Sequence, residues 1–202
     1  MTARPFPNWL EIYRDLPLEK MPWYYADLDP DLARALAARG RNAGRVLDLG
    51  TGPGTQAYAL AALGFDVTAS DLSAHAVELG RAGNATRGLH VEFVQDDILN
   101  TQLTGAFDMV FDRGCFHVFA PELRARYVQA VRGLMAPTGT FFLKCFSELQ
   151  PGNVGPYQSS PEEIREVFAA HFELLEVERT IYQGTLAEPP HALFCTLRPK
   201  RG

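Results

Sequence analysis

The chain has 202 residues, of which 47% are apolar and 21% charged, and a formal net charge of −5. This length suits a single α/β domain that buries a core without disulfides or a structural metal. No run of lysines and arginines stands out, so the electrostatic signature of a nucleic-acid-binding protein is missing. The three cysteines are widely spaced, which indicates neither a disulfide framework nor a zinc motif and is typical of a reducing cytoplasm.

The N-terminal segment is rich in aromatic residues and prolines and lacks the apolar core of a signal peptide. No apolar run in the chain is long enough to span a bilayer. We therefore expect a cytoplasmic protein, monomeric or homodimeric, that binds neither membranes nor nucleic acid. Residues 1–29 are predicted to form an aromatic lid segment, and residues 30–202 to form the folded domain.

Residues 30–39 are predicted to form a short helix that ends at Gly40. Strands and helices then alternate. Strands are predicted at 45–49, 65–69, 89–94, 107–111, 138–146, 173–182 and 190–197, and helices at 55–63, at 73–82, from Pro121 and from Ser160. This order predicts a single doubly wound, Rossmann-like sheet of seven mostly parallel strands with helices on both faces. The turn before the last strand is short, so that strand is expected to be antiparallel.

A glycine loop, Gly50-Thr-Gly-Pro-Gly54, lies between the first predicted strand and the next helix. Glycines allow a backbone to turn tightly and to approach a ligand closely, and ligands of doubly wound sheets bind where the strands end. The spacing is Gly-x-Gly-x-Gly, which differs from the dinucleotide pattern Gly-x-Gly-x-x-Gly. Asp48 precedes the loop, where an anion disfavours a pyrophosphate and suits a cofactor that carries an ammonium group.

Acidic residues also follow the next two predicted strands. The carboxylate of Asp71, after the second strand, can accept hydrogen bonds from both hydroxyls of a ribose. The carboxylate of Asp97, after the third, can accept from an adenine amino group, with Ile98 against the ring. For the neighbouring Asp96 we expect only a solvated loop carboxylate.

Residues 46–54, Asp71 and Asp97-Ile98 resemble, in order and spacing, the first three motifs of the class I methyltransferases that use S-adenosylmethionine (SAM). The resemblance covers roughly residues 40–200. A nicotinamide-binding domain is the alternative. The resemblance implies SAM as the cofactor and a cofactor site made of Asp48, Gly50, Thr51, Gly52, Gly54, Asp71, Leu72, Asp97 and Ile98.

The fourth predicted strand is followed by Asp112-Arg113-Gly114. Together with the aromatic N-terminal segment, this resembles the thiopurine, thiol and tellurite methyltransferase group. The resemblance implies that Arg113 lies close to the cofactor and that Tyr13 or Trp23 touches it from the lid. Asp112 is a candidate to orient the SAM ammonium or the substrate. The continuation to His117 departs from the usual thiopurine-enzyme sequence, which leaves the acceptor open.

Methyl transfer is an in-line displacement, in which an enzyme mainly aligns the reactants and excludes water. A thiol ionises near neutral pH and needs little base catalysis, whereas a hydroxyl or amine acceptor needs a proton acceptor. His117 and Asp112 are the candidate catalytic residues, with His117 as the base.

We therefore expect a methyltransferase of small molecules, with a thiol or other chalcogen acceptor preferred. An O-, N- or C-methyltransferase that uses His117 as base, or a non-catalytic SAM-binding regulatory protein, are the alternatives. No trio of acidic metal ligands is evident, so no metal is expected. Residues 147–159 are predicted to form a loop and are the best candidate for a specificity element.

Overall fold

The computed structural model describes residues 9–40, 43–152 and 155–201, so residues 1–8 of the expected lid lie outside it. The strands are β1 (Arg45–Leu49), β2 (Asp66–Asp71), β3 (Val91–Gln95), β4 (Phe107–Arg113), β5 (Met135–Ser147), β6 (Gln158–Ser159), β7 (Phe172–Ile181) and β8 (His191–Pro199). The helices are α1 (Trp9–Asp15), α2 (Pro30–Arg39), α3 (Thr55–Ala62), α4 (Ala74–Arg87), α5 (Pro121–Leu134) and α6 (Pro161–Phe168), with short 3₁₀ helices at Leu18–Lys20, Ile98–Asn100 and Phe116–Val118.

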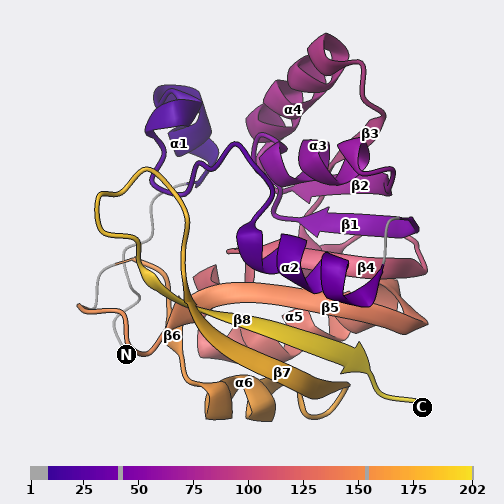
Figure 1. The fold of residues 1–202 in the computed structure, drawn as a ribbon, viewed down its shortest axis with the longest axis vertical. Helices are drawn as coiled ribbons and strands as arrows, with labels where there is room; N and C mark the ends of the chain where they lie inside the picture. The colour runs from indigo at the N-terminus through magenta and orange to yellow at the C-terminus, as the bar shows by residue number, and fades with distance from the viewer. Residues whose placement is uncertain (1–8, 41–42, 153–154, 202) are drawn as a thin grey trace.

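The strands form one sheet in the order β3-β2-β1-β4-β5-β8-β7 (Figure 1). The strands from β1 to β5 are parallel, and β8 is antiparallel to both β5 and β7. The predicted doubly wound sheet with an antiparallel last strand is therefore confirmed. The strand order reverses between β1 and β4, which is the position where such sheets bind their ligands.

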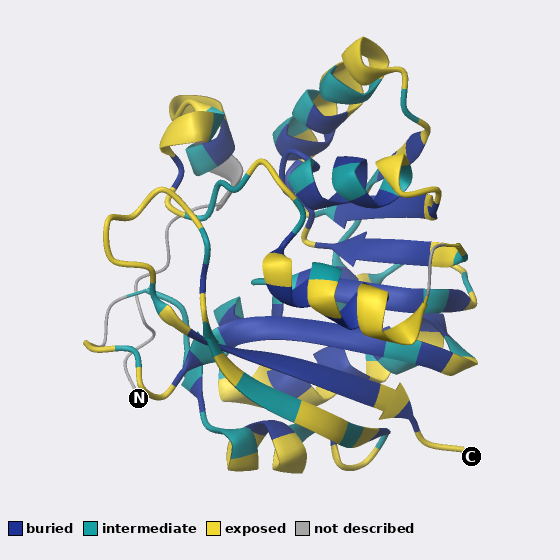
Figure 2. Cartoon of the chain, in the orientation of Figure 1, coloured by how far each residue is buried: buried dark blue, intermediate teal, exposed yellow. Residues whose placement is uncertain are grey.

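Apolar side chains fill a layer on each face of the sheet (Figure 2). On one face α5 and α6 contribute, with Tyr127, Val131, Ile164 and Phe168 fully buried. On the other face α2, α3 and α4 contribute Leu32, Leu36, Ala57, Leu60 and Val77. Helices thus cover both faces. Among the described residues, no helix combines the length and the apolar character that a membrane span requires.

Several predicted helix ends are confirmed. Gly40 closes α2 in the left-handed conformation, and the Ser73 side chain caps α4 by accepting from the Ala76 N–H. Ser160 and Glu163 form the capping box of α6, in which each side chain accepts from the other residue's backbone N–H.

The helix predicted at 73–82 continues to Arg87, because its glycines serve close packing and do not end it. A Cβ at Gly80 would lie 2.3 Å from the Phe93 ring, and one at Gly83 would lie 2.3 Å from the Tyr58 hydroxyl. Two elements were not predicted from the sequence: α1, and the two-residue strand β6, which lies within the predicted loop 147–159 and pairs with β5.

Candidate active site

The glycine loop between β1 and α3 is conformationally restricted to glycine. Gly50, Gly52 and Gly54 have φ angles of 69°, 55° and 87°, a region that side chains disfavour. A Cβ at Gly50 would lie 2.8 Å from that of Cys115, and one at Gly52 would lie 2.7 Å from the Tyr13 hydroxyl. The loop is therefore closely packed beneath the N-terminal segment, with Gly50 exposed and residues 51–54 buried.

Two carboxylates flank this loop. Asp48 is only 2% exposed and accepts a hydrogen bond from the Thr51 hydroxyl at 2.5 Å. Burial raises the pKa of Asp48 to about 7, so its charge is poised near neutral pH. Asp71 accepts from the backbone N–H groups of Gly52 and Ser73, each at 2.8 Å, and burial raises its pKa as well. Asp71 thus links the glycine loop to the start of α4.

The two acidic residues after β3 differ in their hydrogen bonds. Both oxygens of Asp97 are engaged, one by the Leu99 N–H at 3.0 Å and the other by the Asn100 amide at 2.6 Å. Asp96 accepts from the Gln102 N–H with one oxygen, while its Oδ2 is buried and has no hydrogen-bond partner among the described residues. The expectation of a solvated carboxylate at Asp96 is therefore wrong. Of the two, only Asp96 has a carboxylate oxygen without a hydrogen-bond partner among the described residues.

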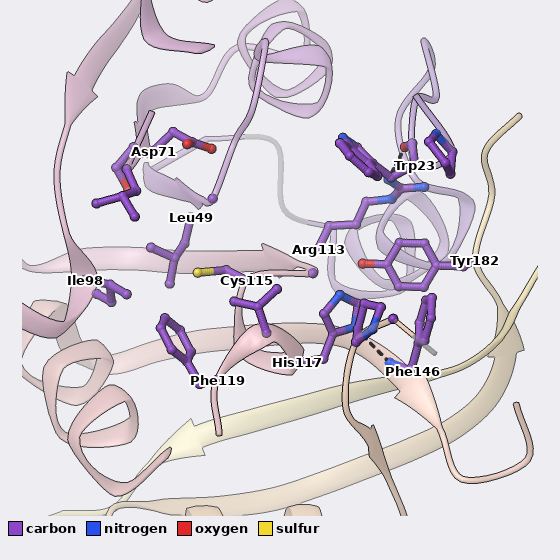
Figure 3. A pocket seen from close by; sticks show the side chains of 18 of the residues that line it. Trp23, Leu49, Asp71, Ile98, Arg113, Cys115, His117, Phe119, Phe146 and Tyr182 are labelled. Carbon is purple, nitrogen blue, oxygen red and sulfur yellow. Dashed lines mark hydrogen bonds between the residues drawn. The ribbon is translucent and has the colours of Figure 1, made fainter. Parts of the chain in front are cut away.

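A cavity of about 330 Å³ opens along the carboxyl ends of the parallel strands (Figure 3). Its acidic end, after β1, β2 and β3, is lined by Leu49, Gly50, Ser70, Asp71, Leu72, Asp96, Asp97 and Ile98. Its aromatic end is formed by His117, Phe146 and Tyr182. Cys115 lies between the two ends, where a ligand that fills the acidic end would meet one in the aromatic end.

A second cavity, of about 40 Å³, lies on the other side of the glycine loop and is lined by Asp48, Thr51 and Gly52. Tyr13, Trp23, Gly50 and Arg113 line both cavities. The Tyr13 and Trp23 rings meet edge to face, with centroids 6.2 Å apart. The structure thus brings most of the predicted glycine, acidic and aromatic residues together around two cavities that share lining residues.

Asp112, a predicted catalytic residue, lines neither cavity. Its side chain is fully buried and accepts from the backbone N–H groups of Gly114, Cys115 and Phe116 and from the Tyr127 hydroxyl. Burial raises its pKa to about 6. With its acceptor positions taken, Asp112 shapes the segment after β4 and has no oxygen free for a substrate or an ammonium group.

His117 lines the cavity, but its chemistry differs from that of a base. Its ring is 5% exposed, and Nδ1 accepts from the Phe146 N–H at 3.1 Å (Figure 3). Burial, together with the positive charges of Arg113 and Arg124, lowers the pKa of His117 to about 3. A histidine with this pKa stays neutral and takes up a proton only weakly.

Arg113, which lines both cavities, connects three segments of the chain through hydrogen bonds. Its guanidinium donates to the Asp29 carboxylate at 2.9 Å, to the Trp23 carbonyl at 3.0 Å and to the Gln183 carbonyl at 2.5 Å. It also packs against the Tyr182 ring, with Cζ 4.9 Å from the centroid. Arg113 therefore holds the N-terminal segment and the β7–β8 connection over the cavities.

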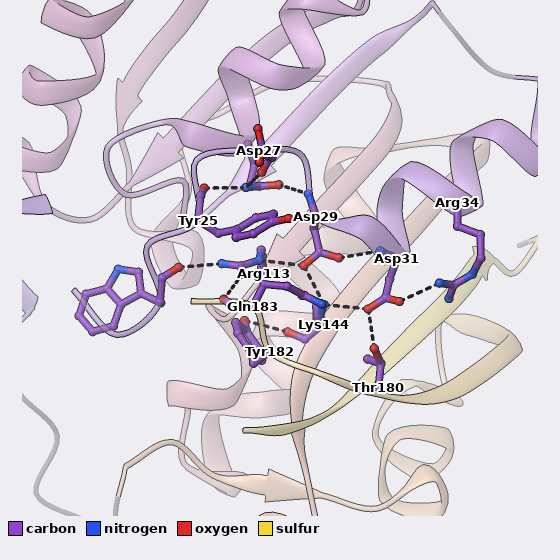
Figure 4. A network of polar contacts seen from close by, with 12 residues as sticks. Tyr25, Asp27, Asp29, Asp31, Arg34, Arg113, Lys144, Thr180, Tyr182 and Gln183 are labelled. Atoms are coloured by element: carbon purple, nitrogen blue, oxygen red, sulfur yellow. Dashed lines mark hydrogen bonds and ion pairs between the residues drawn. The ribbon is translucent and has the colours of Figure 1, made fainter. Parts of the chain in front are cut away.

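A buried ion cluster, which the sequence analysis missed, supports this arrangement (Figure 4). Lys144 on β5 is fully buried and donates to Asp29, Asp31 and Gln183, each at 2.7 Å. One feature of the sequence could have indicated this cluster: Lys144 interrupts the apolar run 141–146, and a lysine is unusual in a buried central strand. Tyr182, which lines the cavity, was missed too.

The comparisons with known proteins agree with this geometry. Residues 46–139 match the family model of a methyltransferase domain. The chain is 30% identical over 160 residues to the 2-heptyl-1-hydroxyquinolin-4(1H)-one methyltransferase of Mycobacteroides abscessus, covering 77% of this chain and 70% of that protein. The chain belongs to the SAM-dependent methyltransferases. Its methyl donor is SAM and its substrates are small molecules.

Solved structures extend the comparison to the fold. The 1,6-didemethyltoxoflavin N1-methyltransferase of Burkholderia thailandensis, with bound substrate and S-adenosylhomocysteine, superposes with a TM-score of 0.69 and 27% identity, over 95% of this methyltransferase and 82% of that chain. A second solved structure concerns the conversion of a disulfide bond into a thioacetal group during echinomycin biosynthesis. It superposes with a TM-score of 0.81 and 27% identity, over 94% of this methyltransferase and 91% of that chain. The named relatives thus act on different acceptors.

Proposed function

We propose that this methyltransferase acts on a thiol or another chalcogen nucleophile that is already ionised when it binds. The observation that carries the proposal is that neither of the two predicted catalytic residues can act as a base at the acceptor side. Asp112 has its oxygens occupied, and His117 stays neutral with its Nδ1 taken. A thiolate needs no proton removed, whereas an alcohol or an amine does.

When bound, SAM would supply the methyl group from its sulfonium. The acceptor's electron pair would form a bond to the methyl carbon as the carbon–sulfur bond breaks, with S-adenosylhomocysteine as the leaving group. Three features support the fit of the chain to SAM. Gly50 and Gly52 of the glycine loop line the cavities, Asp96 has an unpartnered buried oxygen at the acidic end, and Asp48 lies beside the smaller cavity. We infer that Asp71 binds the ribose hydroxyls, Asp96 the adenine amino group and Asp48 the ammonium group.

Because neither His117 nor Asp112 can act as a base, a second class of acceptor is also compatible with the site. The relative that is 30% identical methylates a 1-hydroxyquinolinone, in which an N-hydroxyl is attached to a ring. Such a group also loses its proton readily and binds without help from a base. We therefore place acidic N-hydroxy heterocycles second, ahead of ordinary alcohols and amines.

A panel of acceptors, each offered with SAM, tests the proposal. It contains aromatic and aliphatic thiols, an N-hydroxy heterocycle, phenols and amines, and methylated product is measured by mass spectrometry. We expect the highest kcat/KM for acceptors that are ionised at the assay pH. Preferred turnover of amines or of weakly acidic alcohols would contradict the proposed acceptor class. It would leave the assignment of SAM as the methyl donor unchanged.

The affinity for SAM should rise with pH. The folded-state pKa of Asp48 is about 7, and an ammonium group beside the carboxylate stabilises its charged form and lowers that pKa. Binding is therefore weaker where Asp48 is protonated, by about 10-fold at pH 6 relative to pH 8. Isothermal titration calorimetry across this interval measures the effect.

The variant Asp48→Asn should bind SAM weakly with no pH dependence between pH 6 and 8. Asp66→Asn, at the exposed start of β2, is the matched control and should follow the unmodified protein. If the affinity of the wild-type protein for SAM does not change between pH 6 and 8, Asp48 does not bind the ammonium group.

A further inference from the structure

The two ends of the large cavity present opposite hydrogen-bonding groups. The acidic end contains three carboxylates, Asp71, Asp96 and Asp97, and no other carboxylate lines the cavity among the described residues. Beyond Cys115, the cavity is lined by Trp23, Arg113, His117 and Tyr182, whose side chains all carry hydrogen-bond donors. A substrate that reaches the aromatic end therefore meets hydrogen-bond donors and positive charge, with no carboxylate to accept its protons.

The hydrogen bond to Phe146 determines which nitrogen of His117 carries the proton. Because Nδ1 accepts the Phe146 N–H at 3.1 Å and the ring is neutral, the proton lies on Nε2. Nε2 has no hydrogen-bond partner among the described residues, and it lies beside Gly114, which lines the cavity together with His117. His117 thus offers a donor to the substrate and no acceptor.

Gly114 leaves this donor accessible. A Cβ at Gly114 would lie 3.1 Å from His117 Nε2 and 2.7 Å from the Tyr182 hydroxyl, so a larger residue would crowd both atoms. The Tyr182 hydroxyl makes only a long contact, 3.5 Å, to the Lys144 carbonyl, and burial raises its pKa well above the usual range. Tyr182 therefore also stays protonated, as a second donor beside the first.

The surroundings of these donors are flat and aromatic. The centroid of the Phe146 ring lies 4.8 Å from that of His117 and 5.4 Å from that of Tyr182, and both contacts are edge to face. Leu186 and Pro190, from the β7–β8 connection, add apolar surface to the lining. Aromatic and aliphatic walls favour a planar ring by burial of apolar area and by ring–ring contact.

We propose that the aromatic end binds its acceptor as the anion of a planar aromatic or heteroaromatic ring, and that His117 recognises this anion by donating Nε2–H to it. The inference rests on the proposed function, whose acceptor arrives ionised, and it adds the substrate class and the residue that selects it. Arg113 on β4, Arg124 on α5 and the Tyr182 hydroxyl are the charged and titratable groups that face His117. None of these three groups is an anion, and the Asp29 carboxylate, which acts on Tyr182, is paired with Arg113 and Lys144.

Binding to the protein saturated with S-adenosylhomocysteine tests the inference without any turnover. The probe is 4-nitrothiophenol, which is ionised at pH 7.5, and its neutral counterpart is 4-nitrothioanisole. Mercaptoacetate serves as an anion without a ring. We expect the aromatic anion to bind at least about 10-fold more tightly than either control, since a hydrogen bond to a charged group has an effect of this size.

Two substitutions at one position separate recognition from packing. In His117→Gln the longer side chain places an amide N–H near the position of Nε2, so the preference for the anion should survive within about 3-fold. In His117→Asn the shorter amide can still accept from Phe146 but does not reach the ligand. We expect this variant to lose about 10-fold or more in affinity for the anion, with affinity for the neutral thioether unchanged.

The outcomes distinguish this inference from the proposed function. Equal binding of the anion, the thioether and mercaptoacetate, or equal losses in the two His117 variants, would overturn the inference. Failure of every thiol in the turnover panel would instead overturn the proposed function, because the binding assay does not depend on methyl transfer.

Discussion

Replacing Lys144 with methionine is expected to lower the free energy of unfolding by about 3–5 kcal/mol, and the melting temperature by about 10 °C. The Lys144 ammonium is fully buried and has three partners, of which two are the carboxylates of Asp29 and Asp31. Methionine fills a similar volume but leaves both carboxylates without their shared cation. Asp29 then keeps only Arg113 as a cationic partner, and Asp31 only the largely exposed Arg34. This loss of buried charge compensation is far more costly than the loss of an exposed ion pair.

Arg34→Met is the matched control for this experiment. Arg34 also pairs with Asp31, at 3.0 Å, but its side chain is 53% exposed. We expect a loss below about 1 kcal/mol for this variant. Thermal and urea unfolding without SAM measure both effects. If Lys144→Met unfolds like Arg34→Met, the buried cluster contributes little to stability.

The cluster also explains how segments far apart in sequence form one site. Asp29 precedes α2, Lys144 lies on β5 and Gln183 follows β7, and Arg113 joins the same group from β4. These contacts hold the β7–β8 connection and the N-terminal segment against the strand ends. A change at Lys144 is therefore expected to loosen the walls of the cavity as well as the fold.

Local signals in the sequence were sufficient for most of the fold. Gly40, Ser73 and the pair Ser160 and Glu163 marked helix ends through their own backbone geometry and side-chain hydrogen bonds. Such signals act within a few residues and are therefore readable from one sequence. The Lys144 contacts span 113 and 115 positions along the chain, and no local pattern indicates them.

The place of the site was predictable, but the roles of its residues were not. Parallel strands bring their carboxyl ends to one edge, which is why the segments with Asp48, Asp71 and Asp97 meet. Whether a carboxylate faces a ligand depends on the donors around it. Asp112 meets four internal donors, and Asp96 retains a free oxygen that Asp97 does not have. These differences arise from hydrogen bonds that form only in the folded chain.

Replacing Asp71 with asparagine is expected to weaken SAM binding about 100-fold. The carboxylate ends β2 at the acidic end of the cavity, and we infer that it accepts from the ribose hydroxyls. Hydrogen bonds to a charged group contribute about 1.5–3 kcal/mol each, and asparagine removes the charge. Calorimetric titration with SAM measures the loss, and Asp66→Asn, on the same strand but exposed, should bind normally.

Asp71 also accepts from Gly52 and Ser73, so a loss of affinity alone would not separate ribose contact from loop support. A double-mutant cycle with methylthioadenosine and its 2′-deoxy analogue makes that separation. If Asp71 holds the 2′-hydroxyl, the wild-type protein discriminates between the two nucleosides and Asp71→Asn largely does not. If Asp71 only supports the loop, both proteins discriminate to the same extent, because the two changes are then independent. Equal discrimination would therefore assign the ribose to another residue, even with weakened SAM binding.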